Sequence, residues 1–92
     1  MAEAQKRILC IEDDLEAAAL IVEELVDQGF EPIAAHDGRE GLEAILKHMP
    51  DLVLCDVSMP VMSGFEVLER LTIHLACRRS IPRFIFLAPH GS

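Results

Sequence analysis

The chain has 92 residues, which is the length of one small domain. Hydrophobic residues make up 51% of it and charged residues 26%, so it has the apolar content of a folded domain and not of a disordered tail. Sixteen acidic residues against eight basic ones give a formal net charge of −8. This excludes a general nucleic-acid binder, because phosphates need a basic face, and we expect no direct nucleic-acid partner.

The lack of targeting signals and the few cysteines both favour the cytoplasm. The first seven residues hold no apolar segment of a signal peptide, and the longest apolar runs, 17–22 and 84–89, are far too short to span a bilayer. The three cysteines, at positions 10, 55 and 77, are too few and too scattered for a disulfide framework or a zinc ribbon. We expect a single cytoplasmic domain over residues 1–92, with no membrane partner and with reduced cysteines.

The first part of the chain alternates between two hydrophobic periods. Ile8–Ile11 is a continuous apolar run that stops at three acids, as in a strand buried on both faces. Residues 14–28 then follow helical spacing, and Gly29 is a helix stop signal. The face of this helix that we expect to point inward consists of Leu15, Ala18, Ala19, Val22, Leu25 and Val26.

A second strand and helix follow. The short run Pro32–Ala35 begins with a proline that suits an edge strand. Asp37–Glu40 is a capping-box pattern that opens a helix, and Pro50 closes it. The expected inward residues of this helix are Leu42, Ile45, Leu46 and Met49.

The third strand and helix repeat the first pattern. Leu52–Cys55 is an apolar run that ends at an acid, Asp56, and a second capping box stands at Ser63–Glu66. The third helix is expected to turn Phe65, Leu68, Leu71 or Thr72, and Leu75 inward, and Phe84–Ala88 follows as a fourth strand. Such alternation predicts an α/β fold, in which right-handed crossover helices cover a parallel sheet.

The fourth strand poses a problem of coverage. If the chain stops after it, Phe84–Leu87 form an uncovered hydrophobic sheet edge, and such edges are rarely left free. Either the natural chain continues beyond residue 92 or another chain covers this edge. We expect self-association, either by pairing of fourth strands or by an exchange of terminal elements around residues 76–81.

Acidic residues follow both central strands. Glu12 and Asp13 come after the first strand, and Asp56 comes after the third. In an open parallel sheet, ligands bind beyond the carboxyl ends of the strands, where these carboxylates would converge. Clustered carboxylates favour a hard cation such as Mg²⁺, which shares its coordination shell with phosphate oxygens. This pattern indicates phosphoryl transfer, with a carboxylate as the candidate nucleophile.

Simpler roles exist for each acid. Either Asp13 or Asp14 can serve as the N-cap of the first helix, with Glu16 completing a capping box. Asp56 taken alone can be a turn residue. Neither role explains why both central strands end in acids at the same edge of the sheet.

Two segments resemble the receiver domain of two-component response regulators. These are residues 8–14, with their acid pair, and residues 56–64, which match the family signature D-x-x-M-P-x-M-x-G at every defined position. The resemblance covers about residues 7–88. It implies a flavodoxin-like doubly wound parallel sheet with strand order 2-1-3-4, in which the family's fifth strand and last helices are missing.

The resemblance also implies roles for individual residues. Asp56 matches the aspartate that accepts a phosphoryl group from a histidine kinase or phosphotransfer protein, and Asp13 matches a direct ligand of Mg²⁺ or Mn²⁺. Glu12 matches a partner acid that acts through water. The backbone carbonyl of Ser58 matches a further metal ligand. The residues that shape the site loop are Met59, Pro60 and Gly64.

Two family positions fail to match. Ala88 stands where the family has a hydroxyl residue at the switch position, and the lysine of the fifth strand has no counterpart in the 92 residues. The first function hypothesis is therefore a bacterial Mg²⁺-dependent phosphoacceptor that acts as a switch and not as an enzyme, impaired in this short chain.

Two other function classes compete with it. The first is a receiver-like assembly module that works through protein contacts without phosphorylation. The second is a metal-dependent nuclease site of the topoisomerase-primase type. That type needs a second acid two residues after Asp56, where this chain has Ser58, and the acidic surface also disfavours it.

Overall fold

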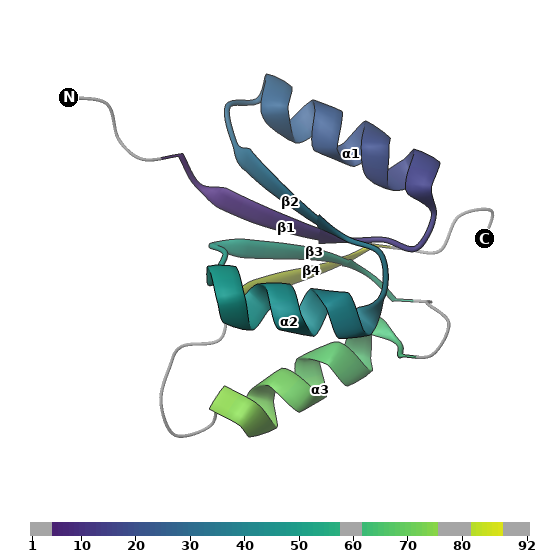
Figure 1. Cartoon of the computed structure of the whole chain (residues 1–92), viewed down its shortest axis with the longest axis vertical. Coiled ribbons are helices and arrows are strands. Elements are labelled where there is room, and N and C mark those ends of the chain that lie inside the picture. The colour runs from purple at the N-terminus through teal and green to yellow at the C-terminus, as the bar shows by residue number, and fades with distance from the viewer. Residues whose placement is uncertain (1–4, 58–61, 76–81, 88–92) are drawn as a thin grey trace.

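The computed structural model describes residues 5–57, 62–75 and 82–87. Its sheet is parallel, with strand order β2-β1-β3-β4. The strands are β1 (Arg7–Ile11), β2 (Glu31–Ala35), β3 (Leu52–Asp56) and β4 (Arg83–Leu87). Helix α1 (Leu15–Asp27) lies on one face, and α2 (Gly38–His48) and α3 (Gly64–Leu75) lie on the other (Figure 1). The predicted flavodoxin-like order 2-1-3-4 is confirmed, and each strand boundary is within one residue of its prediction.

Local signals explain where α1 begins and ends. The Asp14 carboxylate accepts hydrogen bonds from the backbone N–H groups of Glu16, at 3.0 Å, and Ala17, at 3.3 Å. These bonds satisfy donors that a helix start leaves unpaired. Gly29, two residues after the helix, has a φ of 90°, a left-handed conformation that glycine adopts without strain.

Capping side chains also open the other two helices. The Asp37 carboxylate accepts from the Glu40 N–H at 2.8 Å, and the Glu40 carboxylate reaches back to the His36 N–H at 2.9 Å. In α3, the Ser63 hydroxyl accepts from the Glu66 N–H at 3.2 Å. Both predicted capping positions therefore act as caps.

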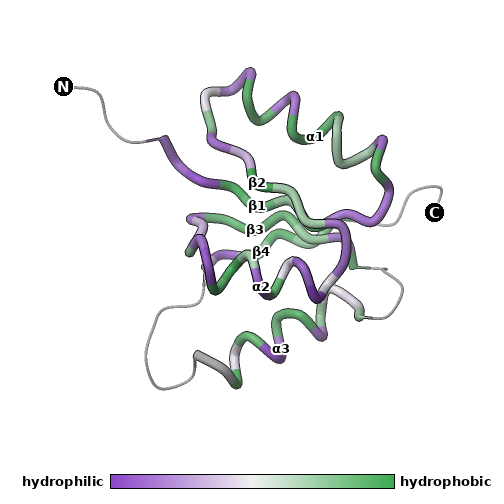
Figure 2. The backbone as a smooth tube through the Cα atoms, in the orientation of Figure 1, coloured by the Kyte–Doolittle hydropathy of each residue, from purple (hydrophilic) through white to green (hydrophobic). Residues whose placement is uncertain are grey.

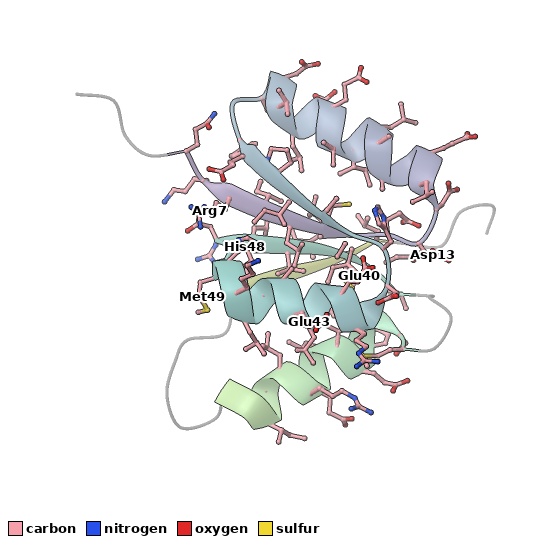
Figure 3. The ribbon with its side chains drawn as sticks, in the orientation of Figure 1. Arg7, Asp13, Glu40, Glu43, His48 and Met49 are labelled. Atoms are coloured by element: carbon pink, nitrogen blue, oxygen red, sulfur yellow. The ribbon has the colours of Figure 1, made fainter. Side chains whose placement is uncertain are left out.

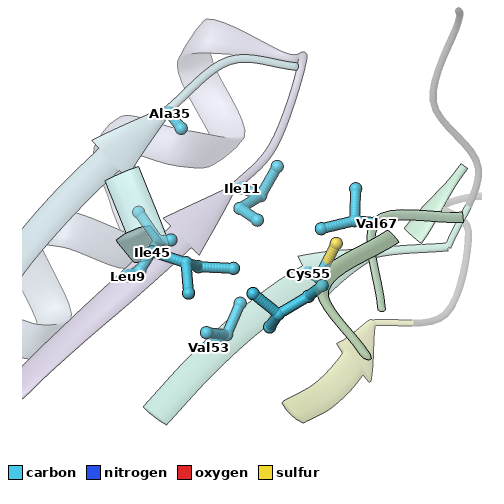
Figure 4. Close-up of a cluster of buried hydrophobic side chains, with 8 residues drawn as sticks. Leu9, Ile11, Ala35, Ile45, Val53, Cys55 and Val67 are labelled. Atoms are coloured by element: carbon cyan, nitrogen blue, oxygen red, sulfur yellow. The ribbon is translucent and has the colours of Figure 1, made fainter. Parts of the chain in front are cut away.

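The core lies between the sheet and the α2–α3 layer. Apolar residues concentrate along the strands, whereas the helices alternate between polar and apolar residues (Figure 2). The buried side chains of this core come from β1, β2, β3, α2 and α3 (Figure 4): Leu9, Ile11, Ala35, Ile45, Val53, Cys55, Val67 and Leu71. The complete burial of Leu9, Cys10 and Ile11 confirms that β1 is covered on both faces.

The predicted inward face of α1 is too wide. Ala18 and Leu25 are buried as expected, but Ala19 is exposed, and Leu15 and Val26 are 63% and 55% exposed. Figure 1 shows α1 as the one helix that the described residues place on this face of the sheet. A single helix lying over β1 and β2 needs only a narrow apolar stripe, so its flanks stay in solvent.

Two inward predictions on the other face are also wrong. Met49 is exposed because it is the C-cap residue of α2, and its left-handed φ of 48° turns it off the helical face. Phe65 is 58% exposed, and Val67 is buried in its place beside Leu71. The buried stripe of α3 starts at Gly64 and recurs three and seven residues later, which puts position 65 beside it.

Several predictions fall outside the described residues. They concern the site-loop residues Ser58, Met59 and Pro60, the switch position Ala88, and the exchange hinge at 76–81. Within the part of the chain that the structure describes, no helix has the length and apolar character needed to cross a membrane.

Candidate functional site

Three acids meet at the carboxyl end of the sheet. Strands β1 and β3 are parallel neighbours, with Ile11 paired to Cys55, so the residues that follow both strands emerge at the same edge. One carboxylate oxygen from each of Glu12, Asp13 and Asp56 lies within 4.8 Å of the others. The structure thus brings together the three acidic residues that the sequence pattern singles out.

The three carboxylates differ in burial. Glu12 is 2% exposed and Asp56 is 7% exposed, whereas Asp13 is open to solvent. Burial raises the pKa of the Glu12 carboxyl above its ordinary value, and the negative charges of Asp56 and Asp13 raise it further. A hydrogen bond from the Asp14 N–H acts in the opposite direction on the Glu12 pKa. In the absence of a cation, the cluster therefore disfavours full ionisation.

Backbone groups hold Glu12 in place. Its own N–H donates to the Ala35 carbonyl on β2 at 3.0 Å, and its Oε1 accepts from the Asp14 N–H at 3.1 Å. The first bond continues the β1–β2 ladder by one residue, so the acid is anchored to the sheet and not to a loose loop.

The adjacent aspartates have separate roles. Asp14 caps α1, and the alternative in which Asp13 caps it with Glu16 is therefore wrong. Asp13 stays at the carboxyl end of the sheet, opposite the end at which Arg7 and His48 lie (Figure 3). Asp14 thus supports the site in two ways, because its side chain starts α1 and its N–H binds Glu12. The position of Asp14 directly before an apolar helix indicated the capping role. No sequence pattern indicated its hydrogen bond to Glu12.

Gly64 closes the base of the site beside Asp56. The Gly64 N–H donates to the Val57 carbonyl at 3.1 Å, which fixes the start of α3 against the end of β3. Gly64 is the one loop residue of the predicted set that the structure describes, since Ser58, Met59 and Pro60 lie outside the described residues.

The donor set suits a divalent cation. Hard cations such as Mg²⁺ and Mn²⁺ take oxygen ligands, and three carboxylates within 4.8 Å offer such ligands on one side of an ion. A cation would also offset the mutual repulsion that raises the pKa of Glu12. Exposure of Asp13 leaves the outer side of this cluster accessible from solvent.

Comparison with known proteins gives a consistent picture. The family model of the response regulator receiver domain matches residues 8–88. The probable transcriptional regulator ycf29 of Pyropia yezoensis is 34% identical over 85 residues, which cover 92% of this chain and 37% of that protein. The transcriptional regulatory protein DltR of Streptococcus agalactiae is 43% identical over 65 residues, which cover 71% of this chain and 29% of that protein. The chain spans about a third of the length of these curated relatives.

Solved structures agree with the sequence relatives. The chemotaxis protein CheY4 of Vibrio cholerae superposes with a TM-score of 0.84 at 29% identity, covering 97% of this chain and 72% of that one. The response regulator TrrA of Thermotoga maritima, crystallised in complex with Mg²⁺-BeF, gives a TM-score of 0.81 at 31% identity, covering 95% of this chain and 72% of that one.

Proposed function

Since this chain belongs to the response regulator receiver domain family, we propose that it is a phosphoacceptor of two-component signalling, with Asp56 as the phosphorylated residue. The observation that carries the proposal is the gathering of Glu12, Asp13 and Asp56 at the carboxyl end of β1 and β3. We propose one receiver domain over residues 1–92, located in the cytoplasm, that acts as a switch and not as an enzyme on a separate substrate.

In the proposed reaction, a carboxylate oxygen of Asp56 attacks the phosphorus of a phosphohistidine. The new O–P bond forms an acyl phosphate while the P–N bond breaks, and the imidazole leaves with the electron pair and takes up a proton. Asp56 is mostly buried at the end of β3, and the neighbouring Asp13 of the same cluster is open to solvent. The donor in this proposal is a histidine kinase or a phosphotransfer protein.

We assign the metal ligands by combining geometry with the family motif. Asp13 and Asp56 are proposed as direct ligands of Mg²⁺ or Mn²⁺, and Glu12 as a partner through water. A bound cation would supply the positive charge that offsets these carboxylates and the incoming phosphoryl oxygens. Ser58 is proposed to add its backbone carbonyl on the strength of the motif alone.

Two features of the chain predict weak phosphorylation of Asp56. Ala88 has no hydroxyl at the family's switch position, so a hydrogen bond to the phosphoryl group is lost there. No residue among the 92 matches the family's fifth-strand lysine. We therefore expect labelling of this chain to be slow or partial. A second proposed partner is another copy of the chain, joined at the edge of β4.

The deciding experiment is incubation of the 92-residue chain with acetyl phosphate and Mg²⁺, followed by intact-mass and peptide mass spectrometry. We expect a phosphoryl adduct on Asp56. It should not form when EDTA is present during the incubation, and it should not form in Asp56→Asn. Asp51→Asn, which removes an exposed acid remote from the cluster, should keep the adduct. If acetyl phosphate does not modify the chain and beryllofluoride does not bind to it with Mg²⁺ present, the alternative of a phosphorylation-independent interaction module is favoured instead.

A further inference from the structure

The start of α2 lies directly against the start of α3. Both helices begin at the end of the sheet where the strands finish (Figure 1). A Cβ on Gly38, the first residue of α2, would stand 2.9 Å from the Met62 Cβ and 3.0 Å from the Val67 Cγ2. Carbon atoms in contact lie about 3.5–4.0 Å apart, so a side chain at position 38 would push Met62 away by roughly half an ångström or more.

Gly38 is needed for space and not for backbone conformation. Among the residues that the structure describes, Gly29 is the one glycine with a positive φ. Position 38 therefore has a backbone conformation that alanine also adopts, and within a helix alanine is the more favourable residue. An alanine at position 38 would favour α2 itself but oppose its packing on α3.

Contacts with the sheet fix α2 on its side of this contact. The Glu40 carboxylate accepts from the N–H of His36, the residue that follows β2. One turn after Gly38, Gly41 lies against the side chain of Ile11, the last residue of β1, with no room for a Cβ. The start of α2 is thus held at the ends of both strands, so a side chain at position 38 would displace α3 and not α2.

The other side of the contact leads to Asp56. Met62 packs against the hydrophobic core two residues before the first residue of α3. That first residue, Gly64, donates its N–H to the Val57 carbonyl at 3.1 Å and lies against the Asp56 carbonyl oxygen. A displacement of Met62 would therefore reach the backbone that carries the Asp56 carboxylate.

We propose that Gly38 is a positioning residue for the acidic cluster. Because position 38 has no side chain, Met62 and the first turn of α3 pack closely on α2, and this packing holds the Asp56 carboxylate beside those of Glu12 and Asp13. The inference rests on the proposed function, in which the cluster binds a cation and Asp56 accepts a phosphoryl group. It makes a residue of α2, remote from Asp56 in sequence, a determinant of both steps.

Gly38→Ala tests this role. Its affinity for Mg²⁺, from a titration followed by amide NMR, and its rate of labelling by acetyl phosphate should each fall about tenfold, because small misplacements at a reacting centre have large effects. The amide signals of Val57 and Gly64 should shift. Loss of stability alone does not produce this result, since the apparent Kd of a chain that is about nine-tenths folded rises by only about a tenth.

Ile45→Val is the matched control on the same helix. It removes a methyl group from a fully buried residue about two turns after Gly38, so it lowers stability and leaves the contact with α3 unchanged. It should bind Mg²⁺ and accept the phosphoryl group as the unchanged chain does. If Ile45→Val loses as much Mg²⁺ affinity as Gly38→Ala, the effect is general destabilisation and the proposal is overturned.

A double-mutant cycle tests the path through Met62. In a Met62→Gly background, which has no Cβ to crowd, Gly38→Ala should lower the affinity for Mg²⁺ by less than it does alone. An equal loss in both backgrounds would overturn the path. Met62→Ala removes most of the contact from the α3 side, so it should also weaken Mg²⁺ binding, and it replaces Gly38→Ala if that variant does not fold.

The unchanged chain separates the two levels of inference. If it neither binds Mg²⁺ nor takes up a phosphoryl group, the proposed function fails, and the role of Gly38 fails with it. If the unchanged chain binds Mg²⁺ and the folded variant, Gly38→Ala or Met62→Ala, binds it equally well, only the role of Gly38 is overturned.

Discussion

Gly64 lies against the backbone of Asp56, so that a Cβ on Gly64 would stand 2.6 Å from the Asp56 carbonyl oxygen. The same Cβ would be 3.1 Å from the Cys55 sulfur. The carbonyl belongs to the last residue of β3, which is paired with Leu87 on β4, so it cannot retreat without disturbing the sheet. Position 64 therefore needs a glycine for close approach, and the base of the candidate site depends on this contact.

We predict that Gly64→Ala lowers the free energy of unfolding by about 1–3 kcal/mol, the usual range for overpacking against fixed neighbours. Urea denaturation followed by circular dichroism measures the change. Leu20→Ala, at a side chain that is 68% exposed on α1, should change stability by less than about 0.5 kcal/mol. If Gly64→Ala is as stable as the unchanged chain, the backbone of β3 at Asp56 shifts to accommodate the added methyl group.

The separate roles of Asp13 and Asp14 give a second prediction. Asp13→Asn should weaken binding of Mg²⁺ at least tenfold in a titration followed by amide NMR, because it removes a charge from the cluster, and it should leave stability nearly unchanged. Asp14→Ala should lower the free energy of unfolding by about 1 kcal/mol through loss of the N-cap.

Asp14→Asn is the control for this pair, since asparagine is also a good N-cap. It should restore most of the stability that Asp14→Ala loses. If Asp13→Asn binds Mg²⁺ as tightly as the unchanged chain, then Asp13 is not a ligand.

The sequence predicted the sheet well because β1 is buried on both faces, and β3 is buried on one face and half-buried on the other. Their continuous apolar runs, Ile8–Ile11 and Leu52–Cys55, favour a parallel sheet that is covered on both faces. The convergence of Glu12, Asp13 and Asp56 followed from the adjacency of these two strands. Topology and site were thus predictable together.

Helix faces were less predictable, because periodicity does not say how wide a stripe the neighbours cover. Val26 and Phe65 fit a helical apolar pattern yet are more than half exposed. The N-cap of α1 was ambiguous for a related reason, since Asp13 and Asp14 are both good caps and only backbone geometry separates them. The Asp14 N–H bond to Glu12 had no sequence signature.

The raised pKa of Glu12 predicts a pH dependence of stability in metal-free protein. Since this carboxyl holds its proton more tightly when folded, the folded state binds more protons than the unfolded state between the two pKa values. The free energy of unfolding should therefore fall as pH rises from the unfolded pKa of Glu12 through its folded pKa. Urea titrations in EDTA at a series of pH values measure this slope.

Glu12→Gln isolates the effect from the other carboxyl groups. The difference in stability between Glu12→Gln and the unchanged chain should grow in favour of glutamine with rising pH and then level off. Saturating Mg²⁺ should reduce this difference, because the cation stabilises the ionised cluster. If this stability difference is independent of pH, Glu12 has the same pKa in the folded and unfolded states.

The two buried thiols give the last prediction. Burial is the main cause that raises the pKa of Cys10 to about 11 and that of Cys55 to about 12, and neighbouring acids add to both shifts. Both side chains are fully buried, on opposite faces of the sheet. Since the thiolate is the reactive form, these raised pKa values leave only a small fraction of either thiol ionised at pH 8, on the order of one Cys10 in a thousand.

A disulfide reagent such as DTNB should therefore leave both thiols of a Cys77→Ala chain unmodified in native buffer and modify both within minutes in urea. Gly64→Ala, which crowds the Cys55 sulfur and destabilises the fold, should accelerate the native reaction about tenfold for each ~1.4 kcal/mol of lost stability. Rapid modification of the unchanged chain in native buffer would contradict the burial of β1 and β3. Acceleration in Gly64→Ala without any loss of stability would indicate local opening at the end of β3 instead of global unfolding.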